Sequence, residues 1–567
     1  MRKVDLHTDL CVVGGGMAGI TTALSAARRG VKVVLIQDRP VLGGNASSEC
    51  RMWICGAPGQ NSLYRETGIL EEIELENFIY NESLNYSMWD QVLYGKVKYQ
   101  EGLTLLLNTV CQRADMEGSA ISSVTAYQMT TETYYTVHAK FYADCSGDSV
   151  LAPLTGASFR QGRESQSEYN ESIAPLVADS CTMGISCLFQ VREDTRPHKF
   201  VPPSWAHKYT SKDCFPERLV HLDTNWWWIE LGGTANCIDD AESIKDELLR
   251  IAMGVWDYVK NYSDLDADNY RLDWVGFLPA KRESRRYIGD YVVNQNDVES
   301  GGEFDDVVAY GGWKMDDHFP EGFDYPAHPT IYHPAPCPWG IPYRALYSKD
   351  VDNLYCAGRN ISVTHTALSS SRVMATCSSI GQAVGTAVAI AIEDNVSKRD
   401  VDIHKLQQYL IQDDCYIPHV ERVLSPLTIS ADTQYPSLKD GLDRDLPDIS
   451  TGASVAIGDS ITYTWTSYIP AKALTLVWDS HLTRAIHNMP CVYHLDNPSS
   501  VVPSTLVKSY EVRITTKEGE KAIYTTLDNR LRHVKIPIGE QISSVSVIPL
   551  STYGDSEECR LISMYVD

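Results

Sequence analysis

The alternation of apolar and polar positions is clearest near the start of the chain. Leu10–Val13 is a short continuous apolar run, which is typical of a parallel strand covered on both faces. After a glycine-rich turn, apolar residues recur at helical spacing from Ile20 to Ala27, and Gly30 can end that helix in the left-handed conformation. A second apolar run follows over 31–36. This pattern predicts a strand–helix–strand unit of the Rossmann type.

The rest of the chain changes texture twice. Residues 158–340 are richer in Trp, Pro and charged residues than the preceding segment. Residues 353–356 form a further apolar run, which is followed by a turn and by a helix expected to begin at Gly381. Beyond about residue 425, alternating segments such as 461–465 and 510–514 predict short antiparallel strands. We therefore predict an α/β fold with a Rossmann-type nucleotide-binding domain (1–157 and 341–412), an inserted α+β substrate domain (158–340), a linker (413–450) and a C-terminal all-β sandwich (451–567).

Composition narrows the choice of partners. The 567 residues include 49 Lys and Arg against 74 Asp and Glu, a formal net charge of -25. Such a surface repels polyanions, so we expect neither nucleic acid nor an acidic membrane as a partner. No run reaches the roughly 20 apolar residues that would cross a bilayer. The 15 cysteines, an odd number without tandem C-x-x-C pairs, favour a reducing compartment, and we expect a cytoplasmic protein.

The turn after the first strand has the chemistry of a phosphate site. It reads Gly14-Gly15-Gly16-Met17-Ala18-Gly19. Gly14 permits the tight turn, Gly16 lets a pyrophosphate approach the backbone, and Gly19 lets helix and strand pack closely. The helix start adds free N–H groups and the positive end of its dipole. Because the whole strand–turn–helix–strand context is present, dinucleotide binding is favoured over a glycine turn without a ligand.

Four segments resemble the FAD-dependent oxidoreductases of the glutathione-reductase-like flavoproteins, distant relatives of the fumarate-reductase flavoproteins. They are the turn at 14–19, Leu42-Gly43-Gly44-Asn45, Asp144-Cys145-Ser146-Gly147-Asp148, and Ala357-Gly358-Arg359 with Gly381-Gln382-Ala383. The resemblance implies FAD in an extended pose. The FAD is expected to be non-covalent, because no His or Cys lies in 38–48, where fumarate-reductase relatives attach it.

The resemblance also implies which residues bind the cofactor. They are Gly14, Gly16, Met17, Ala18, Gly19, Gln37, Asp38, Arg39, Gly43, Gly44, Asn45, Val110, Ser146, Gly147, Asp148, Gly358, Arg359, Gly381, Gln382 and Ala383. The helix start expected at Gly381 would lie near the N1/O2 edge of the flavin, where it would stabilise negative charge. The alternative is that Gly381 and Ala383 are small only because the helix is buried and packs closely.

The end of the second strand departs from the family, which usually has Glu there to accept both ribose hydroxyls. This chain has Gln37, followed by Asp38. An amide oxygen can accept the bond without the charge assistance of a carboxylate. Asp38 either turns inward to compensate or is a solvated turn residue, and the sequence leaves both open.

His365 and Arg372 are the candidate catalytic residues, because they lie between two flavin-like segments. His365 titrates near neutral pH and could take a hydroxyl proton while a hydride passes to flavin N5. Arg372 could hold a carboxylate or a developing alkoxide. A structural histidine and an ion-paired arginine are the alternative. No His/Cys cluster has zinc spacing, so no metal is expected.

The middle domain offers candidates for substrate binding. Arg282 and Arg285, in the run 281–286, could bind an anionic group or form salt bridges. The three tryptophans at 226–228 are expected on a strand, where Trp228 could stack on a ligand or fill the core. His333 lies in a loop flanked by prolines, and such loops often line sites.

The leading hypothesis is an FAD-dependent oxidoreductase that transfers a hydride between FAD and a small organic substrate, with an electron acceptor still to be identified. A carbohydrate-derived alcohol or an activated alkene is the expected substrate. Cys50 and Cys55 suggest a flavin-linked disulfide reductase instead, although Cys50 lies six residues after Gly44 rather than two, and no second dinucleotide fingerprint is present. A non-catalytic flavin scaffold with a ligand-binding sandwich is the third possibility.

Overall fold

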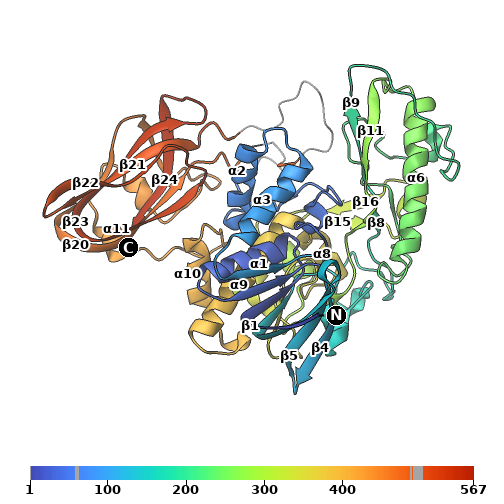
Figure 1. The fold of residues 1–567 in the computed structure, drawn as a ribbon, viewed down its shortest axis with the longest axis horizontal. Coiled ribbons are helices and arrows are strands. Elements are labelled where there is room, and N and C mark those ends of the chain that lie inside the picture. Colours follow the sequence, from blue (N-terminus) through green and yellow to red (C-terminus); the bar gives the residue numbers. More distant parts are fainter. Residues whose placement is uncertain (1, 58–62, 485–487, 490–501) are drawn as a thin grey trace. The chain divides into compact units, whose positions relative to one another are not determined.

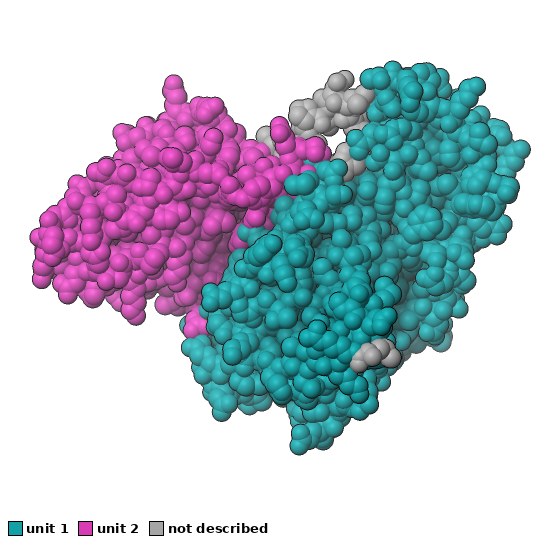
Figure 2. Space-filling view, in the orientation of Figure 1, with its two compact units in different colours: residues 1–57, 84–406, 487–499 teal, residues 58–83, 407–486, 500–567 magenta. Residues whose placement is uncertain are grey.

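The computed structural model describes residues 2–57, 63–484, 488–489 and 502–567. The chain divides into two compact units, one of residues 1–57, 84–406 and 487–499 and the other of residues 58–83, 407–486 and 500–567 (Figure 2). This division differs from the expected one, since 158–340 belongs to the first unit and 58–83 to the second.

A seven-stranded sheet forms the centre of the first unit, in the order β3-β2-β1-β6-β5-β4 with β18 also paired to β6 (Figure 1). Strands β1, β2, β3, β6 and β18 are parallel, whereas β4 and β5 are antiparallel. The bounds are β1 (Arg2–Val13), β2 (Val33–Ile36), β3 (Leu103–Leu106), β4 (Thr109–Glu117), β5 (Ala120–Gln128), β6 (Thr133–Asp144) and β18 (Leu354–Cys356). The predicted parallel Rossmann-like sheet is confirmed.

Two helices cross closely beside this sheet, α1 (Met17–Arg28) and α9 (Met374–Glu393) (Figure 1). Thr22 Oγ1 donates a hydrogen bond to Gly381 O at 2.9 Å. A Cβ on Gly381 would collide with Ala18 O, so the crossing requires glycine there. The expected helix start at Gly381 is wrong, because α9 begins two turns earlier and Gly381 serves the helix crossing.

Other helices of this unit are α3 (Tyr86–Lys98), α4 (Leu151–Thr155) and α8 (His365–Ser371). Within the described residues, α9 is long and apolar enough to cross a membrane by length and composition, but 89% of its apolar window is buried in the fold. It is therefore accounted for as a core helix.

The segment between β6 and β18 forms a cap of small sheets around the long helix α6 (Ala241–Asn261). Strands β9 and β11 pair antiparallel and lie beside α6 (Figure 1). The cap elements are α5 (Gln166–Tyr169), α7 (Gln295–Glu299), β7 (Phe159–Arg160), β8 (Ile185–Ser186), β9 (Phe189–Glu193), β10 (Glu230–Leu231), β11 (Tyr270–Val275), β12 (Ala280–Lys281), β13 (Arg286–Tyr287), β14 (Val307–Gly311), β15 (Met315–His318), β16 (Thr330–His333) and β17 (Trp339–Pro342).

The three consecutive tryptophans lie in a turn, so the expected strand at 226–228 is wrong. Asn225 Oδ1 accepts a hydrogen bond from Trp227 N at 3.2 Å, and this local bond closes the turn. Trp226 and Trp228 are nonetheless both fully buried, with ring centroids 6.0 Å apart. They fill the core of the cap rather than a binding surface.

The second unit is built on a six-stranded antiparallel sheet in the order β19-β24-β20-β23-β21-β22. The apolar sides of these strands share one core, which agrees with the expected all-β C-terminal region. Its elements are α2 (Ile69–Tyr80), α10 (Ile403–Gln412), which begins in the first unit, α11 (Pro426–Ser430), β19 (Ala453–Ala456), β20 (Ile461–Trp478), β21 (Val507–Thr516), β22 (Gly519–Thr526), β23 (His533–Thr552) and β24 (Glu558–Val566).

Buried ion pairs explain why distant segments join this second unit. Arg484 is buried and pairs with Glu71 Oε2 of α2 at 2.6 Å. Arg532 pairs with Asp414 at 3.2 Å, which ties part of the expected linker to the sheet. The partners in each ion pair are far apart in the sequence. No local sequence pattern therefore predicts that these segments join the C-terminal sheet.

Candidate active site: a cavity with a glycine wall and a charged wall

One cavity of about 370 Å³ lies within the first unit. It includes the carboxyl ends of the parallel strands β1 and β2, where ligands bind in open α/β sheets. Most residues predicted to bind the cofactor line it: Gly14, Gly16, Met17, Ala18, Gln37, Asp38, Arg39, Gly43, Gly44, Asn45, Val110, Ser146, Gly147, Asp148, Gly358 and Arg359. The predicted residues Gly19, Gly381, Gln382 and Ala383 do not; they lie where α1 packs against its neighbours.

We call the part formed by 14–18 and 43–45 the glycine wall. Gly14 has a φ of +104°, and a Cβ there would lie 2.5 Å from the Cys145 backbone, so packing requires glycine. At Gly16 the nearest atom to a Cβ would be Gly44 Cα at 3.9 Å, an ordinary contact. Protein packing therefore does not explain the glycine at 16, whereas a ligand in the cavity does.

The first turn of α1 completes this wall. No side chain caps it among the described residues, so the N–H groups of its first turn have no side-chain acceptor and can serve an anion in the cavity. The neighbouring loop is held in place by Trp89 of α3, whose Nε1 donates to Ala46 O at 2.9 Å. A glycine cradle beside free helix N–H groups fits a pyrophosphate.

Gln37 braces the glycine turn. Its Oε1 accepts a hydrogen bond from Gly15 N at 2.7 Å, and its Nε2 donates to Val41 O at 3.2 Å. The amide oxygen is thus already used in the turn. Asp38 also lines the cavity and is largely exposed, with Arg39 3.7 Å away as its ion-pair partner.

Asp148, which also lines the cavity, is the centre of a group of charged residues. It accepts hydrogen bonds from Lys281 Nζ at 2.6 Å, Arg359 Nη2 at 2.8 Å and Ser284 Oγ at 2.8 Å. Burial raises the pKa of Asp148, but the two cations outweigh burial and lower it to about 2. Lys281 lines the cavity and was missed as a site residue, although the basic run at 281–286 pointed to it.

A further part of the lining, which we call the charged wall, consists of Arg282, Asp316, Arg372, Trp313 and Ser186. Arg282 Nη1 donates to Ser186 Oγ at 2.9 Å, and Arg372 Nη2 pairs with Asp316 Oδ2 at 3.2 Å. The predicted residues Arg282 and Arg372 are thus brought together at one cavity. The sequence carries no motif around Asp316 or Trp313 that would have identified them.

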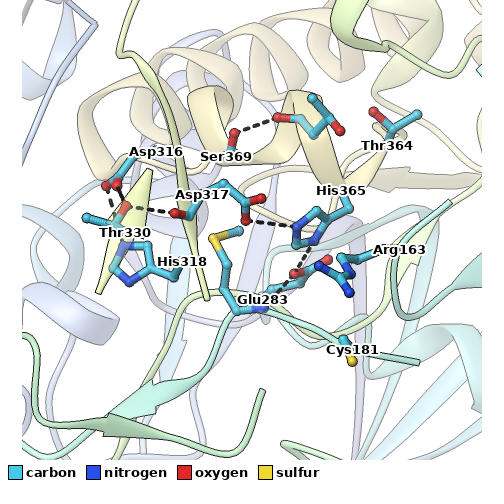
Figure 3. Close-up of polar contacts among 12 residues, drawn as sticks. Arg163, Cys181, Glu283, Asp316, Asp317, His318, Thr330, Thr364, His365 and Ser369 are labelled. Atoms are coloured by element: carbon cyan, nitrogen blue, oxygen red, sulfur yellow. Dashed lines mark hydrogen bonds and ion pairs between the residues drawn. The ribbon is translucent and has the colours of Figure 1, made fainter. Parts of the chain in front are cut away.

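His365 does not line the cavity; it is buried, with Asp317 and Glu283 beside it (Figure 3). Its Nδ1 is 2.8 Å from Glu283 Oε2 and its Nε2 is 3.0 Å from Asp317 Oδ1. Burial lowers the pKa of His365, but the two carboxylates raise it to about 10. An imidazolium that donates from both nitrogens has no lone pair for a proton, which argues against the expected general base.

The remaining predicted substrate residues lie outside the cavity lining. Arg285 stacks over the Phe159 ring at 5.5 Å, and Trp228 Nε1 donates to Leu219 O inside the cap core. His333 ends β16, paired with Met315 of β15. Each has a structural role in the cap, and none of the three contacts the cavity.

The two cysteines of the C-x4-C motif have different surroundings. Cys55 lines the cavity. Cys50 is buried, its Sγ donates to Leu278 O at 3.5 Å, and burial raises its pKa to about 12. A buried thiol with so high a pKa is a poor nucleophile, which does not favour disulfide chemistry. Among the described residues, no group of His, Cys, Asp and Glu could hold a metal ion.

A parallel sheet with a glycine turn and a cavity at its strand ends defines a dinucleotide-binding enzyme of the Rossmann type. The chain belongs to the FAD dependent oxidoreductase family, whose family model matches residues 9–410. Membership of this family makes the chain an FAD-dependent oxidoreductase with FAD as its cofactor.

Individual relatives match only short segments. The chain is 55% identical to fumarate reductase (cytochrome) of Shewanella frigidimarina over 38 residues, 7% of this chain and 7% of that protein. It is 39% identical to sarcosine oxidase subunit alpha of a Corynebacterium species over 72 residues, 12% of this chain and 8% of that protein. These matches cover less than a tenth of either relative.

Among solved structures, a geranylgeranyl bacteriochlorophyll reductase-like protein from Thermoplasma acidophilum aligns with 73% of this chain and 85% of its own. The TM-score is 0.32 and the identity 12%.

Proposed function

We propose that this FAD-dependent oxidoreductase transfers a hydride between a small organic molecule and FAD held non-covalently in the cavity. The observation that carries the proposal is that the glycine wall and the charged wall line the same cavity. The glycine wall fits a pyrophosphate, and the charged wall is formed by cap residues and Arg372. FAD, when bound, supplies a two-electron acceptor or donor.

The residues divide the work between cofactor and substrate. Gly16 and the first N–H groups of α1 hold the pyrophosphate, and Asp38 accepts from a ribose hydroxyl because Gln37 is engaged by Gly15. Arg372 orients the substrate. Apolar side chains such as Leu278 line the same space and keep water from the reacting atoms.

A carbohydrate-derived alcohol or an activated alkene remains the proposed substrate, with a separate electron acceptor. A cytoplasmic location stays part of the proposal, supported by the cysteines. Their number is odd and they form no tandem C-x-x-C pairs, which is common in proteins of reducing compartments.

The cofactor assignment is tested with two glycine variants. Wild-type protein should purify yellow and release FAD on denaturation. Gly16→Val should remove the FAD while circular dichroism stays at wild type, because the new side chain enters the cavity without a clash in the protein. Gly95→Val is the matched control: Gly95 lies in α3, a Cβ there meets nothing within 4 Å, and FAD should remain. A colourless wild type that cannot be reconstituted with FAD contradicts the proposal.

The reaction is tested by anaerobic titration of the FAD-loaded protein with sugars, polyols, hydroxy acids and thiols. Bleaching of the flavin absorbance by a sugar, polyol or hydroxy acid supports oxidation of an alcohol. Dithionite-reduced protein mixed with alkenes conjugated to a carbonyl tests the opposite direction through reoxidation. Bleaching by thiols alone would favour the disulfide reductase instead.

A further inference from the structure

We infer that the substrate of this oxidoreductase carries a carboxylate, which Arg372, supported by Arg282, binds at the charged wall. The inference rests on the proposed function and assigns a substrate class to the same cavity. It follows from unpaired donors, from a count of charges and from the position of Arg372 relative to the glycine turn.

Arg372 has hydrogen-bond donors that the protein does not satisfy. It follows α8 and immediately precedes α9, and its Nη2 donates to Asp316 O at 3.1 Å. Its Nε is buried and has no hydrogen-bond partner among the described residues. Trp313 lies on the same wall, and its buried Nε1 also has no hydrogen-bond partner among the described residues. A buried donor without an acceptor destabilises the site, and a ligand oxygen that reaches it removes that penalty.

The charged wall also holds more positive than negative groups. Arg282 lies 3.3 Å from Glu230, and Arg372 pairs with Asp316. His318 lies between these carboxylates, with Nδ1 2.7 Å from Glu230 and Nε2 3.5 Å from Asp316. Burial lowers the pKa of His318, but both carboxylates raise it above its ordinary value and favour the imidazolium. Among the residues that line the cavity at this wall, two arginines therefore accompany one carboxylate, in a chain whose net charge is -25.

The position of Arg372 separates it from the phosphates of the cofactor. Gly381 packs against Ala18 in the first turn of α1, and Met374 precedes Gly381 by seven residues on the same helix. At 1.5 Å per residue, the start of α9 lies about 10 Å along the helix axis from that crossing. Arg372 is thus placed for a ligand beyond the glycine turn, and the N-terminal dipole of the long helix α9 adds to the attraction for an anion.

The surplus of one positive charge favours a carboxylate over a phosphate ester. A carboxylate carries one negative charge and matches the planar fork of a guanidinium. A phosphate monoester carries about 1.5 to 2 negative charges near neutral pH and would leave part of its charge unbalanced.

The test measures binding to purified, FAD-loaded protein through the change in the flavin absorbance spectrum. The probes are acetate, succinate and benzoate, their amides, and inorganic and phenyl phosphate. At least one carboxylate should bind saturably, and its amide should bind at least tenfold more weakly. Arg372→Met should weaken that carboxylate at least tenfold, and Arg372→Lys should weaken it less, because the charge remains. FAD content should match wild type in both variants.

Arg285→Met is the matched control, since Arg285 belongs to the same basic run but lies outside the cavity lining. Its carboxylate affinity should stay within twofold of wild type. Equal binding of amides, binding of phosphates alone, or no binding of any carboxylate overturns the inference. So does loss of FAD in both Arg372 variants, which would place Arg372 on the cofactor. Failure of the wild type to hold FAD would instead contradict the proposed function.

Discussion

The glycine wall and the charged wall differ in how they are assembled. The glycine wall is mostly backbone, and its main turn comes from five consecutive residues, 14–18. The charged wall joins Arg282, Asp316 and Arg372, which come from three separate parts of the chain. The glycine wall therefore depends on the absence of side chains, and the charged wall on their mutual pairing.

The two walls are therefore stabilised by different kinds of contact. The glycine wall rests on the crossing of α1 and α9, where Gly381 allows close approach. The charged wall is supported by two adjacent aspartates of β15, each paired with a buried histidine. Asp316 is 3.5 Å from His318, and Asp317 is 3.0 Å from His365 (Figure 3). Steric changes should damage the glycine wall and charge changes the charged wall.

The largest effect is expected at His365. His365→Ala should lower the free energy of unfolding by about 3–5 kcal/mol, because Glu283 and Asp317 would lose the cation between them. Denaturant unfolding measures the change. His198→Ala is the control, since His198 pairs with Asp194 near the surface and should cost no more than about 1 kcal/mol. An equally stable His365→Ala protein with slow flavin reduction would restore the predicted catalytic role.

Stability should also fall at high pH through the same histidine. The folded pKa of about 10 lies above the unfolded value of 6.5, so this contribution is complete below pH 6.5 and is lost as pH rises towards 10. Between pH 7 and 9.5 the wild type should lose about 3 kcal/mol more than His365→Gln, which cannot titrate there. Parallel pH profiles for the two proteins would contradict this account of the charged wall.

Steric support of the glycine wall is tested with alanine in two helices. Gly381→Ala should lower the free energy of unfolding by about 1–3 kcal/mol, although alanine is the better helix former, because its Cβ meets Ala18 O. Gly95→Ala in α3 meets no atom and should raise it by up to about 1 kcal/mol. Thermal unfolding should therefore shift in opposite directions, and two shifts of the same sign would reject the close crossing as the reason for glycine.

The smallest effect is expected from the thiols. Cys50→Ser/Cys55→Ser should leave FAD content unchanged and the rate of flavin reduction within about threefold, allowing for local repacking. Anaerobic dithiothreitol should produce no long-wavelength charge-transfer band in the wild type. A strong band that disappears in the double variant would connect these thiols to the flavin and revive disulfide chemistry.

Much of the glycine wall was predictable from the sequence, together with the parallel strands and the all-β C-terminal region. Each rests on short-range rules: a period in the apolar residues, a turn that only glycine permits, or a helix start beside a strand end. Gly14 and Gly16 were named on that basis and Asp148 from the resemblance to the flavoprotein family, and all three line the cavity. Arg282 and Arg372 were named as single charges, without their partners.

Only the tertiary structure decided which of these charges act together. His365 looked like a base because its ordinary pKa is near neutral, but its two carboxylate partners come from β15 and from the segment after β12. Gly381 looked like a helix start because small residues open an apolar run there and match a flavoprotein segment, but its role depends on Ala18, more than 350 residues earlier. Local patterns report backbone conformation. The pairing of buried charges and the contact between helices depend on which distant segments pack together, and that is determined by the fold as a whole.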